Sequence, residues 1–250
     1  MIIIKTPEEI QKMKDAGEIV AGVHKTLKEI IKPGISTKHI DEVAEEIILS
    51  AGGTPKQKGY KGYPFATCTS VNDEICHGFP LDNIILKDGD LVTVDMVVNL
   101  NGYLADSAWS YIVGEASADV IKLYDTTKEC LYKGIEQSII GNRIGDIGRA
   151  IEEVAHAAGF SVVKDFVGHG IGTSIHEDPQ VLHYATPVRG PRITEGMVFT
   201  IEPMINAGDW RSKLDANGWT ARTKDGSLSC QFEHTIAITK DGPMILTDQD

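Results

Sequence analysis

Cysteine is scarce in this 250-residue chain, and it has no long apolar stretch. The cysteines show no CxxC spacing and no dense framework, which excludes a disulfide-rich fold and a cysteine-based zinc cluster. No apolar run approaches the roughly 20 residues that cross a bilayer, and the apolar start is too short for a signal peptide. We therefore expect reduced thiols, a cytoplasmic location and no membrane partner. The four cysteines are Cys68, Cys76, Cys130 and Cys230.

Basic residues are also in short supply. The chain has 24 Lys and Arg against 36 Asp and Glu, which gives a formal net charge of -12. Stable nucleic-acid binding needs clustered basic side chains, so this balance argues against it. An evenly solvated acidic surface explains most of the excess, and carboxylates that await cations would explain the rest. The length and the 42% hydrophobic content suit a globular enzyme with one large domain or two small ones.

A hairpin that carries two acids is the first positive signal. Asn101-Gly102 separates two strand-like runs, and both residues of this dipeptide tolerate positive φ. A two-residue turn there pairs Val97 with Asp106, which makes Asp95 a diagonal neighbour of Asp106 on the same face. Such neighbours lie roughly 7–8 Å apart. Two inward-facing carboxylates are costly unless a cation lies between them, so the pattern indicates a metal.

The first strand of the hairpin and a helix-like segment before it recur at a constant offset of 107 residues. Residues 195–202 match residues 88–95, and residues 141–159 match residues 34–52. Chance could produce a few identities, but a constant offset over two kinds of element is harder to dismiss. We interpret the pattern as an internal duplication of a helix followed by an acidic hairpin.

The duplication assigns a partner to each acid of the hairpin. Glu202 falls on Asp95 at the same offset. The return strand of the second copy comes late, after an insertion around residues 209–226, and Glu233 then corresponds to Asp106. Four acids from two related hairpins are therefore expected to converge on one central site.

Helix signals and strand signals alternate along both halves of the chain. Capping residues and apolar periodicity predict helices over about residues 7–31, 37–51, 119–138 and 145–158. The expected fold is α+β, in which helices cover a mostly antiparallel sheet. No linker separates the halves, so we expect a single domain, residues 1–250. Its two pseudo-symmetric halves, about 1–115 and 116–250, would share one sheet and one core.

His169 supplies a nitrogen ligand, because its glycine neighbours leave room for an approaching ion. One imidazole with four carboxylates suits two divalent ions of Mn, Fe, Co or Zn better than a structural zinc. Such a site activates water for amide hydrolysis. A lone strand aspartate is usually solvated and a lone histidine usually structural, but four acids at matched positions favour a metal site. Five other histidines are assigned structural roles: His24, His39, His156, His183 and His234.

Five segments closely resemble type I methionine aminopeptidases, and the resemblance covers essentially the whole chain. It implies peptidase family M24, the pita-bread (creatinase-like) α+β fold with pseudo-twofold symmetry, and the bacterial form of the enzyme. The segments are Asn72-Asp73-Glu74-Ile75-Cys76-His77-Gly78-Phe79-Pro80, Gly168-His169-Gly170-Ile171-Gly172, His176-Glu177-Asp178-Pro179, Ile201-Glu202-Pro203-Met204 and Phe232-Glu233-His234-Thr235.

The resemblance implies a role for each metal ligand. Asp95 would chelate one ion and His169 would bind the other. Asp106 and Glu233 would bridge the two ions. Glu202 would complete the ligands of the second ion and help to handle the proton of the attacking water.

The resemblance also implies catalytic histidines that bind no metal and a pocket for a methionine side chain. His176 would hydrogen-bond the carbonyl oxygen and the intermediate, and His77 would contact the peptide nitrogen side, because transition-state stabilisation needs a donor aimed at developing charge. Aromatic rings and a thiol suit a thioether, although ordinary core packing is the alternative for them. The matching pocket residues are Tyr60, Tyr63, Cys68 and Trp219.

Two positions depart from the family pattern. Ile175 precedes His176 where many members have Phe, and Gln57 stands where some have Cys. The pocket wall is therefore expected to be less aromatic and more polar at its rim. This difference affects fine specificity and not the class of enzyme.

The resulting hypothesis is a metalloexopeptidase that removes the initiator methionine from nascent or new chains with a small second residue. An X-Pro dipeptidase or aminopeptidase of the same fold is the alternative, and the segment from Cys76 to Pro80 and the short length argue against it. A non-catalytic peptide-binding relative would be expected to lose ligands, yet all five are present. The expected partners are N-terminal methionine peptides and, transiently, the ribosome. The expected state is a monomer.

Overall fold

Residues 1–249 of the chain are described in a computed structural model. They include four long α-helices. Their bounds agree with the predicted helices to within two residues at each end. Within the described residues, no helix is long and apolar enough to cross a membrane. The helices are α1 (Pro7–Ile30), α2 (Thr37–Ser50), α3 (Ala118–Glu136) and α4 (Ile144–Ala157), and a short 3₁₀ turn, η1, spans Tyr60–Gly62.

The start of α1 follows directly from its sequence. The Thr6 hydroxyl accepts a hydrogen bond from the Glu9 N–H at 3.3 Å, and the Glu9 carboxylate accepts one from the Thr6 N–H at 2.8 Å. This reciprocal capping satisfies two amides that the helix leaves free. Pro7 occupies the first helical position, where its missing N–H costs nothing. Val20 and Leu27 then recur on the buried face of the helix.

The first large sheet contains the predicted hairpin. It consists of β1 (Thr54–Pro55), β2 (Cys68–Val71), β4 (Leu91–Leu100) and β5 (Tyr103–Ile112), with β1, β2 and β5 all antiparallel to β4. Asp95 pairs with Ala108 and Val97 pairs with Asp106, as the turn predicted. The turn residues Asn101 and Gly102 have φ values of 52° and 90°.

The second half forms the matching hairpin within a five-stranded sheet ordered β15-β14-β9-β7-β8. Here β9 and β14 pair antiparallel, so that His234 lies opposite Ile201. The strands are β7 (Gly168–Gly170), β8 (Glu177–Val181), β9 (Val198–Ile201), β14 (His234–Thr239) and β15 (Gly242–Ile245).

Two three-stranded sheets complete the described strands. One is ordered β13-β10-β6 and the other β11-β12-β3, so β12 from the insertion pairs with β3 from the first half. The expectation of one shared sheet is therefore wrong in detail, because backbone pairing divides the strands among four sheets. The strands are β3 (Glu74–Cys76), β6 (Ser161–Val162), β10 (Met204–Asn206), β11 (Ser212–Leu214), β12 (Ala221–Thr223) and β13 (Ser229–Gln231).

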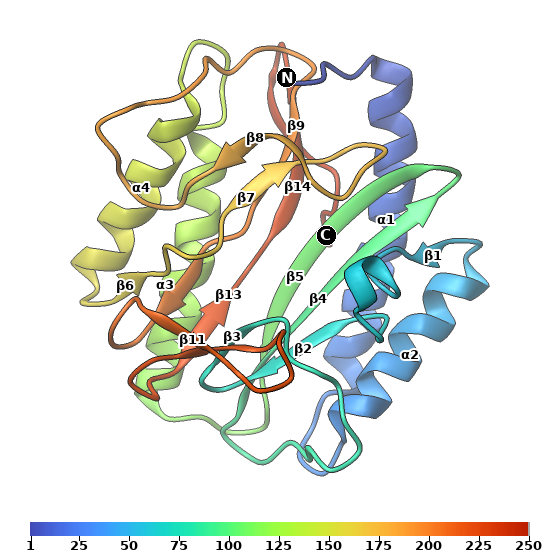
Figure 1. The fold of residues 1–250 in the computed structure, drawn as a ribbon, viewed down its shortest axis with the longest axis vertical. Coiled ribbons are helices and arrows are strands. Elements are labelled where there is room, and N and C mark those ends of the chain that lie inside the picture. Colours follow the sequence, from blue (N-terminus) through green and yellow to red (C-terminus); the bar gives the residue numbers. More distant parts are fainter. Residues whose placement is uncertain (250) are drawn as a thin grey trace.

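Side-chain hydroxyls join the two halves where the sheets separate. The Ser107 hydroxyl donates to the Glu233 carbonyl at 2.7 Å, and the Thr235 hydroxyl donates to the Asp106 carbonyl at 2.8 Å. One backbone bond, from the Glu233 N–H to the Ala108 carbonyl at 2.8 Å, lies between them. We call this contact between β5 and the β13–β14 region the seam. Figure 1 shows β5, β13 and β14 side by side at the centre of the molecule.

The four helices pack against the strands of both halves. Figure 1 shows α1 beside β4 and β5, α2 beside β1 and β2, and α3 and α4 on the side of β13 and β7. One hydrophobic cluster includes buried side chains of α1, α3 and α4, among them Val20, Leu123 and Ile151. The two halves are thus packed on a common core, and the seam is supported from behind by apolar side chains.

Candidate active site

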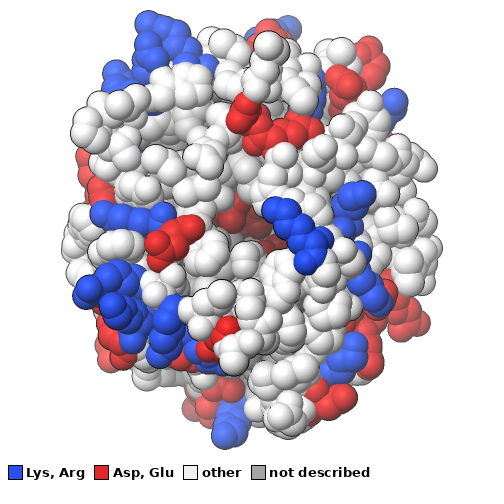
Figure 2. Space-filling model, viewed as in Figure 1, with Lys and Arg blue, Asp and Glu red and all other residues white. Residues whose placement is uncertain are grey.

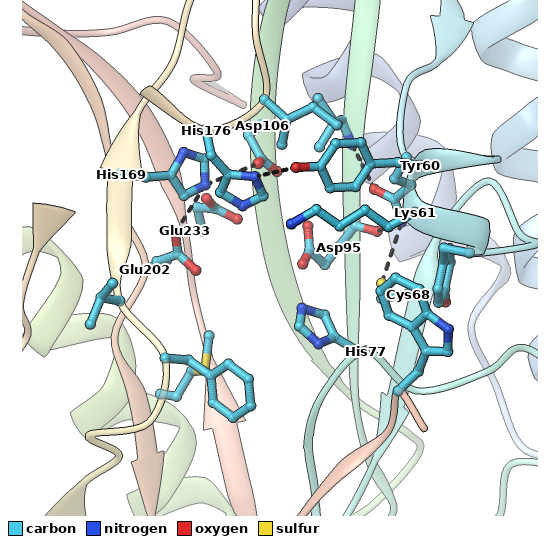
Figure 3. Close-up of a pocket in the computed structure, with 18 residues that line it drawn as sticks. Tyr60, Lys61, Cys68, His77, Asp95, Asp106, His169, His176, Glu202 and Glu233 are labelled. Atoms are coloured by element: carbon cyan, nitrogen blue, oxygen red, sulfur yellow. Dashed lines mark hydrogen bonds and ion pairs between the residues drawn. The ribbon is translucent and has the colours of Figure 1, made fainter. Parts of the chain in front are cut away.

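A cavity of about 250 Å³ lies between the two hairpins. All the predicted metal ligands, both predicted catalytic histidines and the predicted pocket residues line it. Figure 2 shows acidic atoms at the floor of a hollow in this face of the molecule, and Figure 3 shows the side chains that converge there. The cavity is also lined by residues that the sequence did not single out: Lys61, Val97, Phe166, Val167 and Met204.

Each carboxylate of the floor comes from one of the hairpins. Asp95 lies on β4 and Asp106 on β5, while Glu202 directly follows β9 and Glu233 lies between β13 and β14. Asp106, Glu202 and Glu233 are 5%, 8% and 1% exposed. His169, on β7, is 8% exposed. The duplication therefore correctly predicted which acids converge.

His169 is oriented so that one nitrogen faces the acids. Its Nδ1 lies 3.0 Å from the Gly170 carbonyl, which can only accept, so Nδ1 carries the proton. Its Nε2 lies 3.5 Å from the Glu202 carboxylate and 3.7 Å from that of Asp106. Burial lowers the pKa of this imidazole to about 4, with a further contribution from His176. The ring is therefore neutral and presents a lone pair to the carboxylates.

The surroundings of the four acids disfavour the ionised form of their carboxyl groups. Burial raises the pKa of Asp95 to about 7 and that of Glu202 to about 8. Burial and the neighbouring carboxylates raise the pKa of Asp106 and of Glu233 well above their ordinary values. Such a cluster needs positive charge to ionise at neutral pH.

The donor set fits a divalent cation. Ligand atoms of Asp106, His169 and Glu233 all lie within 4.8 Å of one another. The Asp106 Oδ1 and Glu233 Oε1 atoms are buried and have no hydrogen-bond partner among the described residues. Buried polar atoms without partners are rare, and a cation would satisfy both. Glu202 adjoins the group through His169, and Asp95 lies close enough to Asp106 for each carboxyl to alter the pKa of the other.

Two residues that contact the predicted ligands were not identified from the sequence as part of the site. The Thr200 hydroxyl accepts from the His169 N–H at 3.0 Å and donates to Glu202 Oε1 at 2.7 Å. His183, which was assigned a structural role, accepts the Glu202 N–H through Nε2 at 3.1 Å. Outer contacts of this kind orient metal ligands. The sequence signal available for Thr200 was its place in the duplication, two residues before Glu202.

The two predicted catalytic histidines flank the acids without joining them. His176 is exposed at the cavity, with its Nδ1 3.1 Å from the Tyr60 hydroxyl and its ring centroid 4.3 Å from that of His169. His77 lies edge-on to Phe166 at 5.5 Å between ring centroids. Partial burial lowers the pKa of His176 and burial lowers that of His77, so both rings are neutral at pH 7.

The apolar part of the cavity is aromatic. Tyr63 and Trp219 meet edge-on with ring centroids 5.1 Å apart. The Tyr63 hydroxyl is held by the carbonyls of Thr67 at 2.9 Å and Gly78 at 3.1 Å, so the ring and not the hydroxyl is available to a ligand. Burial raises the pKa of the Cys68 thiol well above its ordinary value, which keeps it neutral.

Gln57 lines the cavity, but its amide is engaged by neighbouring protein groups. It is 8% exposed, its amide nitrogen donates to Cys68 Sγ at 3.4 Å and to the Asp95 carbonyl at 3.3 Å. Its amide oxygen accepts the Val97 N–H at 2.9 Å. The side chain is therefore part of the cavity wall and fixes the strand β4 beside it. Ile175 is buried and lines the cavity with an aliphatic surface, as expected.

The insertion in the second half brings Trp219 to the cavity. Its strands β11 and β12 form a hairpin that pairs with β3, next to His77. Arg222 binds Asp215 and Asp73 at 2.7 Å each and Glu74 at 2.6 Å, which fastens the insertion to the first half. The Thr220 hydroxyl donates to the His77 carbonyl at 3.2 Å.

Known proteins resemble this chain in both sequence and fold. Methionine aminopeptidase 1 of Bacillus subtilis is 50% identical over 247 residues, which is 99% of each chain. The structure of methionine aminopeptidase from Thermotoga maritima has a TM-score of 0.97 and 44% identity, covering 99% of this chain and 100% of that one.

More distant structures share the fold over part of their length. Prolidase from Pyrococcus furiosus has a TM-score of 0.79 and 25% identity, and the match covers 99% of this chain but 66% of that one. These likenesses confirm the predicted pita-bread fold. The sequence model of metallopeptidase family M24 matches residues 11–240. The chain belongs to metallopeptidase family M24.

Proposed function

We propose that this protein is a methionyl aminopeptidase that removes the N-terminal methionine from new polypeptides with a small second residue. The observation that carries the proposal is the cavity, in which a buried acid–imidazole group lies beside an aromatic pocket. Relatives that match over almost their whole length are named methionine aminopeptidases. The proposal includes one catalytic domain, a monomeric state, a cytoplasmic location and at most transient contact with the ribosome.

Two divalent ions of Mn, Fe, Co or Zn would occupy the floor of the cavity. Asp95 and His169 would each bind one ion, Asp106 and Glu233 would bridge the pair, and Glu202 would complete the site. Four carboxylates balance two divalent charges, and the raised pKa values of Asp106 and Glu233 indicate that positive charge is needed. Bound divalent ions lower the pKa of water and polarise a carbonyl, as amide hydrolysis requires.

The remaining residues handle protons and orient the peptide. Thr200 occupies Oε1 of Glu202, which leaves the other carboxylate oxygen to accept the proton of the attacking water. When the Tyr60 hydroxyl donates to Nδ1 of His176, the imidazole proton lies on Nε2, where it can donate to the scissile carbonyl oxygen. His77, opposite across the cavity, would contact the peptide nitrogen.

The methionine side chain would lie in the aromatic part of the cavity. Tyr63 and Trp219 offer ring edges and faces, Cys68 offers a neutral thiol, and Ile175 closes the wall. Sulfur–aromatic contacts favour a thioether over a branched aliphatic chain of similar size. Ile175 makes this part of the wall aliphatic.

An X-Pro peptidase is the alternative function on this fold. The prolidase likeness covers only 66% of the prolidase chain, whereas the match to the Thermotoga maritima enzyme covers all of it. We therefore favour methionine release. A non-catalytic peptide-binding protein is disfavoured because all five ligands line one cavity.

Peptide hydrolysis tests the proposal. Metal-loaded protein should cleave Met-Ala-Ser and leave Ala-Pro and Met-Pro peptides largely intact. Glu202→Ala should lower kcat/KM by at least about 100-fold, the loss typical for removal of a general acid–base group. Glu18→Ala, at an exposed position of α1, serves as the matched control and should not change activity.

Preferential cleavage of X-Pro peptides would replace the proposed activity by the alternative. Full activity of Glu202→Ala would refute the assigned mechanism while leaving the substrate class intact. Tight binding of Met-Ala-Ser without any cleavage, in protein shown to hold metal, would support a non-catalytic peptide-binding protein.

A further inference from the structure

Lys61 places a positive charge in the cavity that the proposed reaction does not use. It lies in the turn η1, between Tyr60 and Gly62, and its side chain is exposed and lines the cavity. Figure 3 shows its ammonium directed into the space between His176 and Asp95. The charge of Lys61 also contributes to the lowered pKa of His176, after burial, which places the two side chains near each other.

The backbone holds Lys61 in a conformation that glycine would adopt more easily. Its φ is 48°, and Gly59 and Gly62 on either side have φ values of 86°. The turn is fixed by bonds from the Gly59 N–H to the Tyr63 carbonyl at 2.6 Å and from the Tyr63 N–H to the Tyr60 carbonyl at 2.9 Å. Left-handed geometry is unfavourable for a residue with a Cβ, and such strain gathers at functional sites.

The ammonium of Lys61 has no carboxylate partner. It makes no hydrogen bond or ion pair with the residues from 1 to 249, although four carboxylates line the same cavity, and it lies 5.2 Å from the centroid of the Tyr60 ring. Lys58, three residues earlier, differs in this respect, because it binds both oxygens of Glu45 at 2.6 and 2.9 Å. With two divalent ions balancing the four acids, Lys61 would have nothing in the cavity to neutralise.

We propose that Lys61 is a specificity-determining residue that pairs with a carboxylate of the substrate downstream of the cleaved bond. The inference rests on the proposed function. An exposed ammonium at the cavity, beside Tyr60 and His176, can be reached by the part of the peptide that extends toward solvent. The substrate class is therefore methionyl peptides with an acidic side chain near the cleavage site.

The third residue of the substrate is the position that such a carboxylate would occupy. The first residue fills the aromatic pocket, and the second is restricted to small side chains under the proposed function. The third is the first position free to carry a charged side chain, and consecutive Cα atoms lie about 3.8 Å apart. Pairing across a partly solvated cavity is worth a few tenths to about 1 kcal/mol, which corresponds to a two- to fivefold preference.

A charge-exchange experiment tests this role. The peptides Met-Ala-Asp-Ser, Met-Ala-Asn-Ser and Met-Ala-Lys-Ser are hydrolysed by manganese-loaded wild-type protein, and kcat/KM is measured for each. The wild type should prefer the Asp peptide to the Asn peptide by about two- to fivefold and should disfavour the Lys peptide. Lys61→Gln should bring the Asp-to-Asn ratio close to one, and Lys61→Glu should reverse the order. In 0.5 M salt the wild-type preference should shrink, because salt screens exposed charges.

Lys58→Gln is the matched control, since it removes a lysine of the same loop whose partner is Glu45. The proposal is overturned if Lys58→Gln shifts the Asp-to-Asn ratio as much as Lys61→Gln, or if that ratio is the same in wild type and Lys61→Gln. Equal cleavage of all three peptides by the wild type would refute the proposed role of Lys61 and would leave the proposed function standing. If no methionyl peptide is cleaved, the proposed function is wrong, and the preference that rests on it is wrong as well.

Discussion

His24 illustrates how individual side chains are kept neutral in this core. It is completely buried, with Nδ1 2.8 Å from the Tyr111 hydroxyl and Nε2 3.3 Å from the Ser107 carbonyl. The carbonyl only accepts, so the Nε2 proton points to it and Nδ1 accepts from the phenol. Burial lowers the pKa of His24 to about 3, far below the ordinary value near 6.5.

This shift predicts a loss of stability in acid. Below pH 6.5 the unfolded chain binds a proton at His24 that the folded protein does not bind until about pH 3, so stability falls as the pH falls through this window. At pH 4.5 the contribution amounts to about 2–3 kcal/mol, at 1.36 kcal/mol per pH unit. Urea unfolding at pH 7 and pH 4.5 measures this loss. Between the two pH values, the free energy of unfolding of His24→Gln should fall by about 2–3 kcal/mol less than that of the wild type.

The exposed helix residue His156 provides the control for this measurement. His156→Gln should follow the wild-type pH dependence, because its side chain is 59% exposed and lies outside the core. Parallel curves for His24→Gln and wild type would contradict the assignment of His24 as a neutral buried imidazole.

The four acids of the site could be predicted from the sequence residue by residue. The residues that hold the site in place could not. Asp95 and Asp106 follow from a turn, and Glu202 and Glu233 follow from the duplication. His183 and Gln57, by contrast, act through backbone contacts with Glu202 and Val97 that depend on how distant segments pack. No local pattern predicts such contacts, because the segments that make them are distant in the sequence.

At the level of secondary-structure elements, the β4–β5 hairpin was predictable to the exact register. The reason is local, since a two-residue turn at Asn101-Gly102 leaves only one pairing. The division into four sheets was not predictable. It depends on the seam, where the Ser107 and Thr235 hydroxyls and one backbone bond stand in place of a strand ladder between distant segments.

Two glycine substitutions separate backbone strain from packing. A Cβ at Gly102 or at Gly22 would meet no atom within 4 Å, but Gly102 has a φ of 90° and Gly22 lies inside α1. Gly102→Ala should lower the free energy of unfolding by about 1–2 kcal/mol through left-handed strain. Gly22→Ala should raise it by about 1 kcal/mol through helix propensity. Chemical denaturation measures both, and changes of the same sign would contradict this account of the hairpin turn.

On the scale of the whole molecule, the proposed metal ligands come from both halves. Asp95 and Asp106 belong to the first half, and His169, Glu202 and Glu233 belong to the second. The hydrophobic cluster behind them also draws on both halves. Metal binding should therefore stabilise the chain as one unit.

Metal analysis and thermal unfolding test this expectation. After dialysis against Mn²⁺, elemental analysis should find two ions per chain, and Asp106→Asn should retain fewer. Metal at about 100 times its Kd adds about 2.7 kcal/mol to stability, which raises the Tm by roughly 5–10 °C in a chain of this size. Asp15→Asn, at an exposed position of α1, should match the wild type. Two separate transitions, with only one shifted by metal, would contradict a single domain.

The seam has a further consequence for how the site assembles. Each half carries two of the four carboxylates, so neither half alone has a complete site. Two separate half-length chains would complete it only at concentrations above their dissociation constant. Joined in one chain and aligned by the Ser107 and Thr235 hydroxyls, the halves meet at a high effective concentration. Dilution of the protein should therefore leave the cavity and its ligands intact.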